Sequence, residues 1–518
     1  MAPTDAPTRP RTGQPRRLHG YRIHSQAAAA ALSLVRQSQR RQREASGHVL
    51  ARVRAIASDP HIHALAAAIT ELNERDHRSG GRPRHFPDWC LVLFGASIRV
   101  FGSASATARA LQDPMIWAQV VHAAAPLTQG ADQPATDRGP SRDHWAYFLK
   151  HRISETVLDQ ILLLQRDLAV QRAQEVGLLN ESDRHPVGNY RRDHIVGLDG
   201  KVFSSPLRRL DTERPDRVTG DLRPVRQDPA RQRYGEGGVD GIVWGAKYAI
   251  ASVRSPLTNH RVILGISHFD ATATGGEGRV FTDLATDLAD RTSGIHAFTA
   301  DGAWRGTHLE TIQRDTGCGV IAPARHLTAA RGGITLGRHS FAAKSLPWST
   351  RRIRRETGCG GHQLWACAGT LYEQIIAADG TSQYTEVSRH QTKRDTTRHT
   401  DGTRRHQFYA RYTLPCHRTG TTHTWWEPLL AVATDSTAKF NRAEYLRVVS
   451  THSDQHRRLY GMRQDTESLN AQLERAFYGQ RLPAWGVHNQ TTIVLMAVFA
   501  ENAWARQIWH TELQRQDC

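Results

Sequence analysis

The sequence has few cysteines and no long hydrophobic run. Six cysteines in 518 residues are too few for a disulfide framework, which makes a reducing compartment the expectation. The most apolar stretch, Ile493–Ala500, is far shorter than the ~20 residues that a helix needs to span a bilayer. Residues 1–14 are rich in Pro, Thr and Arg and lack the apolar segment of a secretory signal. We therefore expect a cytoplasmic protein without a membrane partner.

Acidic residues are in clear deficit. The chain carries 68 Lys and Arg against 50 Asp and Glu, which gives a formal net charge of +18. Because 39% of the residues are hydrophobic and 23% are charged, we expect a globular chain, long enough for about two to four domains. Most of the basic excess is Arg, the better bidentate partner for phosphate. The balance indicates a nucleic acid or an anionic membrane surface as partner, unless it reflects a basic bias of the whole proteome.

Changes in composition and in hydrophobic period divide the chain into regions. Residues 1–25 are a basic, Pro-punctuated tail that is expected to be disordered. Residues 26–185 carry helical patterns. Residues 190–325 and 436–510 carry an α/β pattern, and residues 326–435 between them are predicted to be a mostly β insertion.

Part of the helical region has the outline of a helix-turn-helix. Helices are predicted at Pro87–Phe101, Ala104–Leu111 and Pro114–Trp117, with a Gly-containing turn after the first. Such a pair reads DNA in many proteins, but any helical bundle contains one for packing alone. Residues 26–185 are therefore a candidate DNA-binding region, with plain packing as the alternative.

The segment 190–325 shows strands and helices in the order β-β-β-α-β-α-β. The elements are predicted at Ile195–Leu198, Lys247–Arg254, Arg261–Phe269, Val280–Leu288, His296–Thr299, His308–Ile312 and Val320–Ala322. This order fits three antiparallel strands followed by parallel ones. The predicted fold class is α/β, a ribonuclease-H-like mixed sheet flanked by helices, with an N-terminal all-α region and the β insertion. In a sheet of that type the first and fourth strands are neighbours.

Three acidic residues occupy notable places in this pattern. Asp199 closes the first predicted strand, Asp301 closes the fourth, and Glu467 lies in a helical pattern near the C-terminus. Each alone has an ordinary explanation, because Asp-Gly is a common turn and a helical Glu is usually solvated. Together they fit a site in which carboxylates at neighbouring strand ends and on a crossing helix hold two divalent ions.

The helix predicted over Tyr460–Phe477 has two distinct faces. Leu469, Leu473 and Phe477 recur every four residues and predict a buried stripe. A second stripe consists of Tyr460, Arg463, Glu467 and Glu474. The helix thus offers an apolar face to a core and a charged face to a site, where Arg463 could neutralise a carboxylate or hold a phosphate.

These motifs resemble the DDE transposases of bacterial insertion sequences. The spacing Tyr460-x2-Arg463-x3-Glu467-x6-Glu474 is similar to the family's tyrosine-arginine-glutamate-lysine signature at three of four positions. Glu474 stands where the family has lysine, and Arg475 beside it lies about 100° around the helix.

The other two acids carry the resemblance further. Asp199-Gly200 resembles the family's first-acid motif, and Asp301-Gly302-Ala303-Trp304 resembles the second, with Trp304 where tyrosine is frequent. A strand-built insertion between the second Asp and the Glu also fits a subgroup of the family. The resemblance covers about residues 190–510.

The resemblance implies a transposase that cleaves DNA at the ends of its element and transfers the strands to a target. It implies Asp199, Asp301 and Glu467 as catalytic residues and as ligands of two Mg²⁺ or Mn²⁺ ions, with Asp199 shared between the ions. It also implies double-stranded DNA as the partner, a homodimer on that DNA and a nucleoid-associated location. DNA contacts are expected from Tyr460, Arg463, Trp304 and Arg475.

Three alternatives stay open at this stage. Trp304 could stack on a displaced base or belong to the core. The chain could be a DNA-binding protein that descends from a transposase and has lost catalysis, which Glu474 favours and the three intact acids oppose. It could also be a hydrolytic nuclease that uses the same site without strand transfer.

The insertion contains possible zinc ligands. They are Cys359, His362, Cys367, Cys416, His417 and His423. Cys359-x2-His362 has a usable zinc spacing that Cys367 and Cys416 could complete, but the sequence has no CxxC pair and 28 histidines. The favoured interpretation is free buried cysteines and surface histidines.

Overall fold

The computed structural model describes most of the chain. The described residues are 49–73, 85–128, 133–134, 136–206, 213–216, 218–225, 227–235, 242–256, 260–270, 275–327, 333–336, 338–347 and 359–516. The expected tail at residues 1–25 lies outside them. The chain divides into two compact units, residues 1–52 and 53–518, and only residues 49–52 of the first are described. All that follows concerns the second unit and these four residues.

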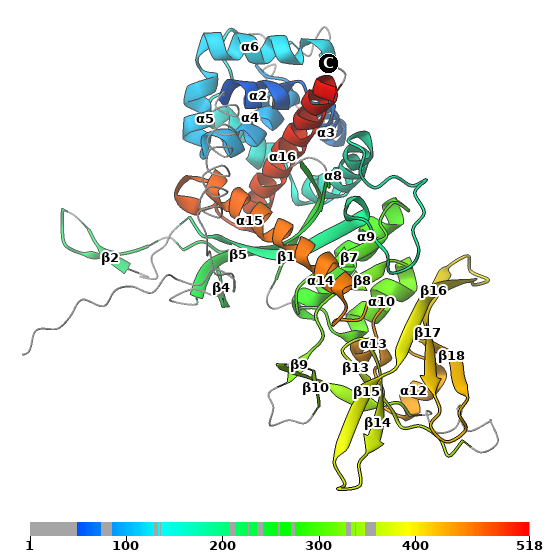
Figure 1. Ribbon diagram of the computed structural model, residues 1–518. Coiled ribbons are helices and arrows are strands. Elements are labelled where there is room, and N and C mark those ends of the chain that lie inside the picture. Colours follow the sequence, from blue (N-terminus) through cyan, green and yellow to red (C-terminus); the bar gives the residue numbers. More distant parts are fainter. Residues whose placement is uncertain are drawn as a thin grey trace, which may run out of the picture. The chain divides into compact units, whose positions relative to one another are not determined.

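A mixed sheet forms the centre of the second unit (Figure 1). Its strands are β1 (Ile195–Ser204), β4 (Gln232–Gly235), β5 (Ile242–Arg254), β6 (Arg261–Phe269), β7 (Ala297–Thr299) and β8 (Gly319–Ile321). Their order is β6-β5-β1-β7-β8, with β4 pairing the start of β5. β5 runs antiparallel to β1 and β6, whereas β7 and β8 run parallel to β1. The predicted ribonuclease-H-like order, with first and fourth strands adjacent, is confirmed.

Helices cover both faces of this sheet. One face packs against α9 (Gly276–Arg291), α10 (Gly306–Thr316) and the end of α8 (Glu155–Glu175). The other face packs against α15 (Gln464–Ala476) and α16 (Val487–Gln516). The strands alternate accordingly, since Val196 and Leu198 of β1 belong to the first core and Phe203 to the second. Asp199, which follows Leu198, therefore faces the α15 side.

The N-terminal helices continue the second of these cores. They are α2 (Val49–Ala57), α3 (Pro60–Asn73), α4 (Asp88–Phe101), α5 (Ala104–Leu111), α6 (Pro114–Ala124), α7 (Arg142–His151) and α8. The predicted helix-turn-helix elements exist, and α4 and α5 meet at 112°. However, α4 is buried along most of its length and packs on α16, so it serves as scaffold. A DNA-reading role for this region stays a prediction.

The insertion is mostly β, as predicted, and its strands form antiparallel sheets. Its strands are β9 (His326–Leu327), β10 (Ile334–Leu336), β11 (His339–Phe341), β12 (Ala343–Ser345), β13 (Leu364–Cys367), β14 (Thr370–Ile376), β15 (Ser382–Glu386), β16 (Ser388–Arg398), β17 (Arg404–Pro415) and β18 (Thr422–Pro428). They form sheets β10-β11-β9, β12-β13-β14-β15 and β16-β17-β18. Short helices α12 (Ala433–Thr437) and α13 (Arg442–Tyr445) then lead back to the core.

Two predicted boundaries near the acids are wrong. β1 does not end at Asp199, because its pairing with β5 continues to Ser204. The helix predicted over Tyr460–Phe477 is interrupted, because α14 (Asp454–Tyr460) is followed by a 3₁₀ turn at Gly461–Arg463 before α15 begins. Both changes leave the acids on the same elements as predicted.

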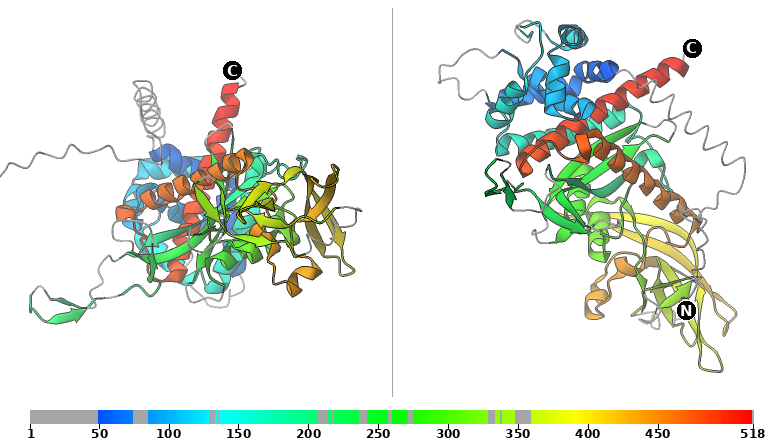
Figure 2. Two further views of the ribbon diagram at one scale, coloured as in Figure 1. Left: turned by 60° about the horizontal axis from the view of Figure 1, so that its bottom comes forward. Right: turned by 90° about the vertical axis from the view of Figure 1, so that its left-hand side faces the viewer.

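The chain between β1 and β5 forms further short strands. Within its described residues, β2 (Glu213–Pro215) and β3 (Leu222–Pro224) form an antiparallel hairpin, and β4 joins the sheet. Figures 1 and 2 show this hairpin standing away from the central sheet. Its turn exposes Val218 almost completely.

Among the described helices, none alone has the length and apolar composition of a membrane span, although the bent pair α4–α5 does when both are counted together.

Candidate active site

Strands β1 and β7 bring the first two acids to matching positions. Their parallel register pairs Gly197 with Thr299; Asp199 lies two residues further along β1, and Asp301 lies two residues after Thr299, in the turn that follows β7. Such strands are about 4.8 Å apart. β7 ends at Thr299 while β1 continues, and Asp199 therefore lies where β1 loses its β7 neighbour. The two carboxylates therefore come from neighbouring segments of the chain, near the C-terminal end of β7.

Asp199 is held by two neutral donors. Its Oδ1 accepts a hydrogen bond from the Gly200 backbone N–H at 3.0 Å, and its Oδ2 accepts one from Asn470 Nδ2 at 2.9 Å. The side chain is only 8% exposed. The carboxyl group is therefore fixed in orientation by β1 on one side and α15 on the other.

The electrostatic surroundings of Asp199 identify the rest of the site. The pKa of Asp199 is raised to about 6, chiefly by burial and in addition by the Asp301 and Glu467 carboxylates. The Arg463 guanidinium opposes this rise in pKa. Because interactions between charges are largely screened beyond about 10 Å, the three acids and Arg463 belong to one region of the surface.

α15 lies along β1 in a matched register. A Cβ on Gly197 would come within 2.5 Å of Thr466 Cγ2, so glycine is what allows the helix to approach here. Four residues later, Asn470 bonds Asp199, and four later again Glu474 pairs with Lys201 at 3.0 Å. Four helical residues advance about 6.0 Å and two strand residues about 6.6 Å, so the contacts repeat in step.

Glu467 lies at the exposed edge of this arrangement. It is in the first turn of α15, its side chain is 50% exposed, and its Oε1 pairs with Arg463 Nη1 at 2.9 Å. The oxygens of the three acids do not all come within 4.8 Å of one another. Among the described residues, two groups of side chains meet that criterion, and neither contains these acids. The three carboxylates repel one another, because one guanidinium does not balance their charge. The ion pair with Arg463 keeps Glu467 beside that residue.

Tyr460 ends α14, directly before the 3₁₀ turn that contains Arg463. Its ring stacks on His456, with centroids 5.4 Å apart. Burial raises the pKa of Tyr460, the Asp301 carboxylate raises it further, and Arg463 lowers it. The signature residues Tyr460, Arg463 and Glu467 therefore do gather around the two aspartates.

Asp301 shapes the turn that follows β7. Its Oδ1 accepts a hydrogen bond from the Ala303 backbone N–H at 2.9 Å. A Cβ on Gly302 would meet no atom within 4 Å, so the space beside this turn is open. Asp301 itself is partly exposed.

Trp304 requires a correction. The expectation that it contacts DNA conflicts with its position, because it is 1% exposed and packs edge-to-face on Phe281 at 6.2 Å. Its ring fills the core beneath the Asp301 turn. The core alternative was the right one, and the motif alone could not choose between them because both use an aromatic ring.

Arg475 stays a prediction as a DNA contact. It is exposed near the end of α15, and its Nε donates to the Ala471 carbonyl at 3.0 Å.

The sequence reasoning missed two polar residues of the site. Asn470 lies three residues after Glu467 on the same helical stripe, and Lys201 lies two residues after Asp199 on the same strand face. Both spacings are visible in the sequence. Lys201 also gives Glu474 a partner, so a lysine is present next to the fourth signature position, supplied by β1 instead of α15.

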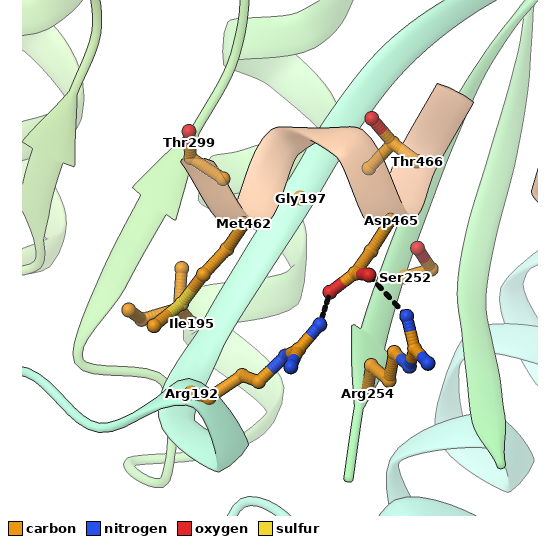
Figure 3. Close-up of a pocket in the computed structure, with 9 residues that line it drawn as sticks. All are labelled: Arg192, Ile195, Gly197, Ser252, Arg254, Thr299, Met462, Asp465 and Thr466. Carbon is orange, nitrogen blue, oxygen red and sulfur yellow. Dashed lines mark hydrogen bonds and ion pairs between the residues drawn. The ribbon is translucent and has the colours of Figure 1, made fainter. Parts of the chain in front are cut away.

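A small cavity lies beside the acids, under the start of α15 (Figure 3). Its volume is about 20 Å³, room for roughly one water molecule. Asp465 projects into it and pairs with both Arg192 and Arg254. These ion pairs anchor α15 to β5 and to the segment before β1. The cavity is too small for a substrate.

Two groups of described side chains have ligand atoms that all lie within 4.8 Å of one another. One consists of Cys359, His362, Cys416 and His423 in the insertion; the other consists of His185, His194 and His296. His194 uses both ring nitrogens, on the Gly294 carbonyl at 2.8 Å and on Asp183 at 3.0 Å, so it has none left for a metal. The histidine group is therefore a packing cluster.

The cysteine-histidine group corrects the prediction for the insertion. His362 and His423 are buried, not on the surface, and they lie beside Cys359 and Cys416. Cys367 belongs to a different apolar cluster. His417 is exposed, as predicted.

Comparison with known proteins gives no relative: no family model matches the chain, and no curated protein and no solved structure matches it.

Proposed function

We propose that the chain is a DNA transposase of the DDE type, which cleaves DNA at the ends of an element and joins those ends to target DNA with divalent metal ions. The observation that carries this proposal is the placement of Asp199 on β1 and of Asp301 directly after the neighbouring β7, together with their electrostatic coupling to Arg463 and Glu467 at the start of α15. The net charge of +18 supports a polyanionic substrate.

The residues of the site fit magnesium or manganese. Carboxylate oxygens are the ligands that these ions prefer, and a few protein ligands suffice because Mg²⁺ keeps several waters. Asp199 would hold both ions, and Asp301 and Glu467 would each hold one. Burial raises the pKa of Asp199 to about 6, and a divalent cation beside it would favour the ionised form again. When bound, two such ions supply activation of the attacking hydroxyl and stabilisation of the leaving oxygen.

Neighbouring residues would prepare the site for DNA. Asn470 fixes Asp199 Oδ2, so the carboxylate keeps one orientation during a reaction. Arg463 would balance the excess negative charge and reach a phosphate once Glu467 leaves it for a metal ion. Lys201 lies on the same strand face as Asp199 and would contact the DNA backbone in place of the signature lysine. This substitute favours a working enzyme over a decayed one.

Cleavage of DNA that carries the chain's own gene tests the proposal. The substrate is a supercoiled plasmid with the gene and its flanking sequence, incubated with the full chain and Mg²⁺ or Mn²⁺. We expect nicked and joined products from the wild type and at least about a hundredfold slower cleavage from Asp199→Asn, Asp301→Asn and Glu467→Gln, since each removes a metal ligand. Binding of the same DNA should change little.

The control variant is Glu512→Gln, which removes an exposed carboxylate on α16. It should cleave like the wild type. Full cleavage by all three acid variants contradicts the proposal. Binding by the wild type without any cleavage supports the decayed alternative, and nicked ends without joined products support the hydrolytic nuclease.

A further inference from the structure

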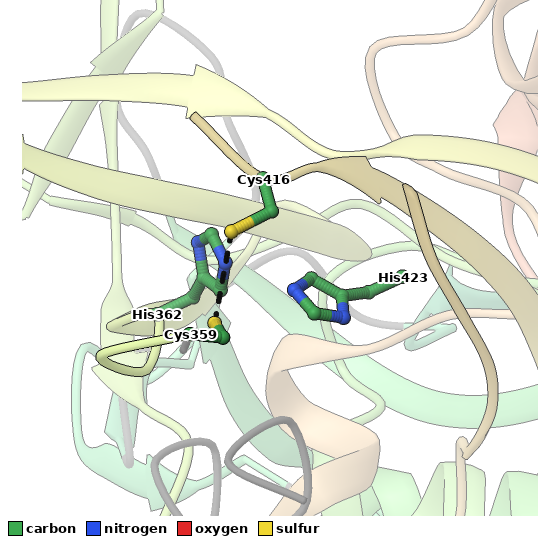
Figure 4. A group of neighbouring side chains, drawn as sticks. All are labelled: Cys359, His362, Cys416 and His423. Atoms are coloured by element: carbon green, nitrogen blue, oxygen red, sulfur yellow. Dashed lines mark hydrogen bonds between the residues drawn. The ribbon is translucent and has the colours of Figure 1, made fainter. Parts of the chain in front are cut away.

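Four side chains in the insertion converge from two separate segments (Figure 4). Cys359 and His362 lie just before β13, Cys416 follows β17, and His423 lies in β18. Their potential ligand atoms all lie within 4.8 Å of one another, and all four residues are at most 7% exposed. A convergence of this kind across 57 residues of chain comes from the fold, not from sequence proximity.

The spacing of the two sulfurs is the spacing that a tetrahedral metal imposes. The Sγ atoms of Cys416 and Cys359 are 3.7 Å apart. Two sulfurs bound to one zinc ion at ~2.3 Å with a tetrahedral angle would be about 3.8 Å apart. A disulfide would need about 2.05 Å, so the two thiols are not bonded to each other.

The surroundings of the two ring nitrogens of His362 also fit a metal site. Its Nδ1 is hydrogen-bonded to the Glu373 carboxylate of β14, while its Nε2 is buried with no hydrogen-bond partner. A carboxylate on one ring nitrogen and a metal on the other is the usual arrangement of metal-binding histidines. The ring of His423 stands edge-on to that of His362, with centroids 5.1 Å apart.

We propose that Cys359, His362, Cys416 and His423 form a structural Zn²⁺ site. Two thiolates and two imidazoles complete a tetrahedron of protein ligands, and a site closed in this way is structural, not catalytic. Soft sulfur and imidazole ligands select zinc, so this site is chemically distinct from the carboxylate site of the core.

The metal would join two parts of the insertion. Cys359 and His362 directly precede β13, an inner strand of the β12-β13-β14-β15 sheet, and Cys416 and His423 flank the turn between β17 and β18. One ion therefore ties that sheet to the β16-β17-β18 sheet. Since the two sheets share no strand pairing, the zinc supplies a direct connection between them.

The metal content of the purified full chain tests the proposal. We expect about one zinc per wild-type chain and less than about a fifth of that in Cys359→Ser, Cys416→Ser and His423→Ala, because three ligands hold structural zinc poorly. The matched control is Cys367→Ser, another buried cysteine of the insertion that lies outside the cluster. It should keep its zinc.

A second measurement covers the case in which a ligand variant does not fold. Wild-type protein is stripped with a chelator and refilled with Co²⁺, which should bind at about one ion per chain with the visible absorption of a tetrahedral S₂N₂ site. The proposal is overturned if stripped wild type binds neither Zn²⁺ nor Co²⁺, if the ligand variants keep their zinc, or if Cys359 and Cys416 form a disulfide in the native protein without metal.

Discussion

Asp199 shows how a single buried carboxyl group can link function to stability. It is 8% exposed, and its two hydrogen-bond donors, Gly200 and Asn470, are neutral. Burial raises its pKa from 3.8 to about 6, so the folded protein binds this proton more tightly than the unfolded chain does. The resulting stabilisation is complete below about pH 4 and is lost as the pH rises through about 6.

We therefore expect Asp199→Asn to stabilise the protein at neutral pH while it abolishes cleavage. In magnesium-free buffer at about pH 8 the gain should approach ~3 kcal/mol, from about two pKa units at 1.36 kcal/mol each, and near pH 4 it should vanish. Urea denaturation of both proteins at the two pH values measures this. Equal stability of the two proteins at both pH values contradicts the assignment. Asp283→Asn, which removes an exposed carboxylate of α9, serves as the control.

At the scale of elements, the packing of α15 on β1 decides whether the site forms. Gly197 leaves the space that Thr466 occupies, and the next contacts along the helix hold Asp199 and Lys201. Any side chain at residue 197 would push α15 away from the strand. The position of Glu467 and Arg463 thus depends on one missing Cβ beneath the helix.

The variants Gly197→Ala and Thr466→Ser test this packing of α15 on β1. Gly197→Ala should destabilise the protein by about 1–3 kcal/mol through overpacking and slow cleavage, because the new Cβ would lie within 2.5 Å of Thr466 Cγ2. Thr466→Ser removes that methyl group and keeps the hydroxyl that donates to the Arg463 carbonyl at 2.6 Å. Combining the two substitutions should restore both stability and cleavage. A double variant as impaired as Gly197→Ala would contradict the packing argument.

Much of the sheet could be predicted from the sequence because its signals are local. The alternation of short apolar runs and one helix predicts the strand order, and the order places Asp199 beside Asp301. The extension of β1 to Ser204 could not be predicted, since it depends on pairing with β5, more than forty residues later. Long-range pairing of that kind leaves little trace in a local pattern.

The contacts of individual side chains were less predictable for a related reason. Polar residues such as Asn470 and Lys201 look like solvated surface until their partners are known. The four metal ligands of the insertion come from segments on two different sheets, and Cys359-x2-His362 is the one recognisable spacing among them. Trp304 fits both a binding surface and a core, and burial alone decides between them.

At the scale of the whole second unit, the N-terminal helices and the candidate site share one core. The apolar cluster on the α15 side of the sheet runs from α2 through α4 and α16 to Leu469 and Leu473 of α15. A helical region that binds DNA would therefore not be an independent module. It would be packed on the same structure that positions Glu467.

A polar network around the buried Arg99 and Glu501 ties these parts together. Arg99 of α4 donates from Nε to Glu501 Oε1 of α16 at 2.7 Å, and Gln472 of α15 donates to Glu501 Oε2 at 3.0 Å. Arg99 also lies over the ring of Trp504, 5.2 Å from its centroid. Glu501 thus joins α4 to α15 through Arg99 and Gln472, and Arg99 also donates directly to the Gln472 carbonyl at 3.5 Å.

Replacing Glu501 should loosen the N-terminal helices and the site together. Glu501→Gln leaves the buried Arg99 without its counter-charge, which costs about 3–5 kcal/mol. Because Gln472 loses a charged acceptor at the same time, hydrogen exchange should speed up in α4, α15 and α16 alike, and cleavage should fall although no metal ligand has changed. The exposed Glu512→Gln variant should leave exchange unaltered. Faster exchange confined to α4 and α16, with α15 and cleavage unchanged, would show that the helical region and the site are energetically separate.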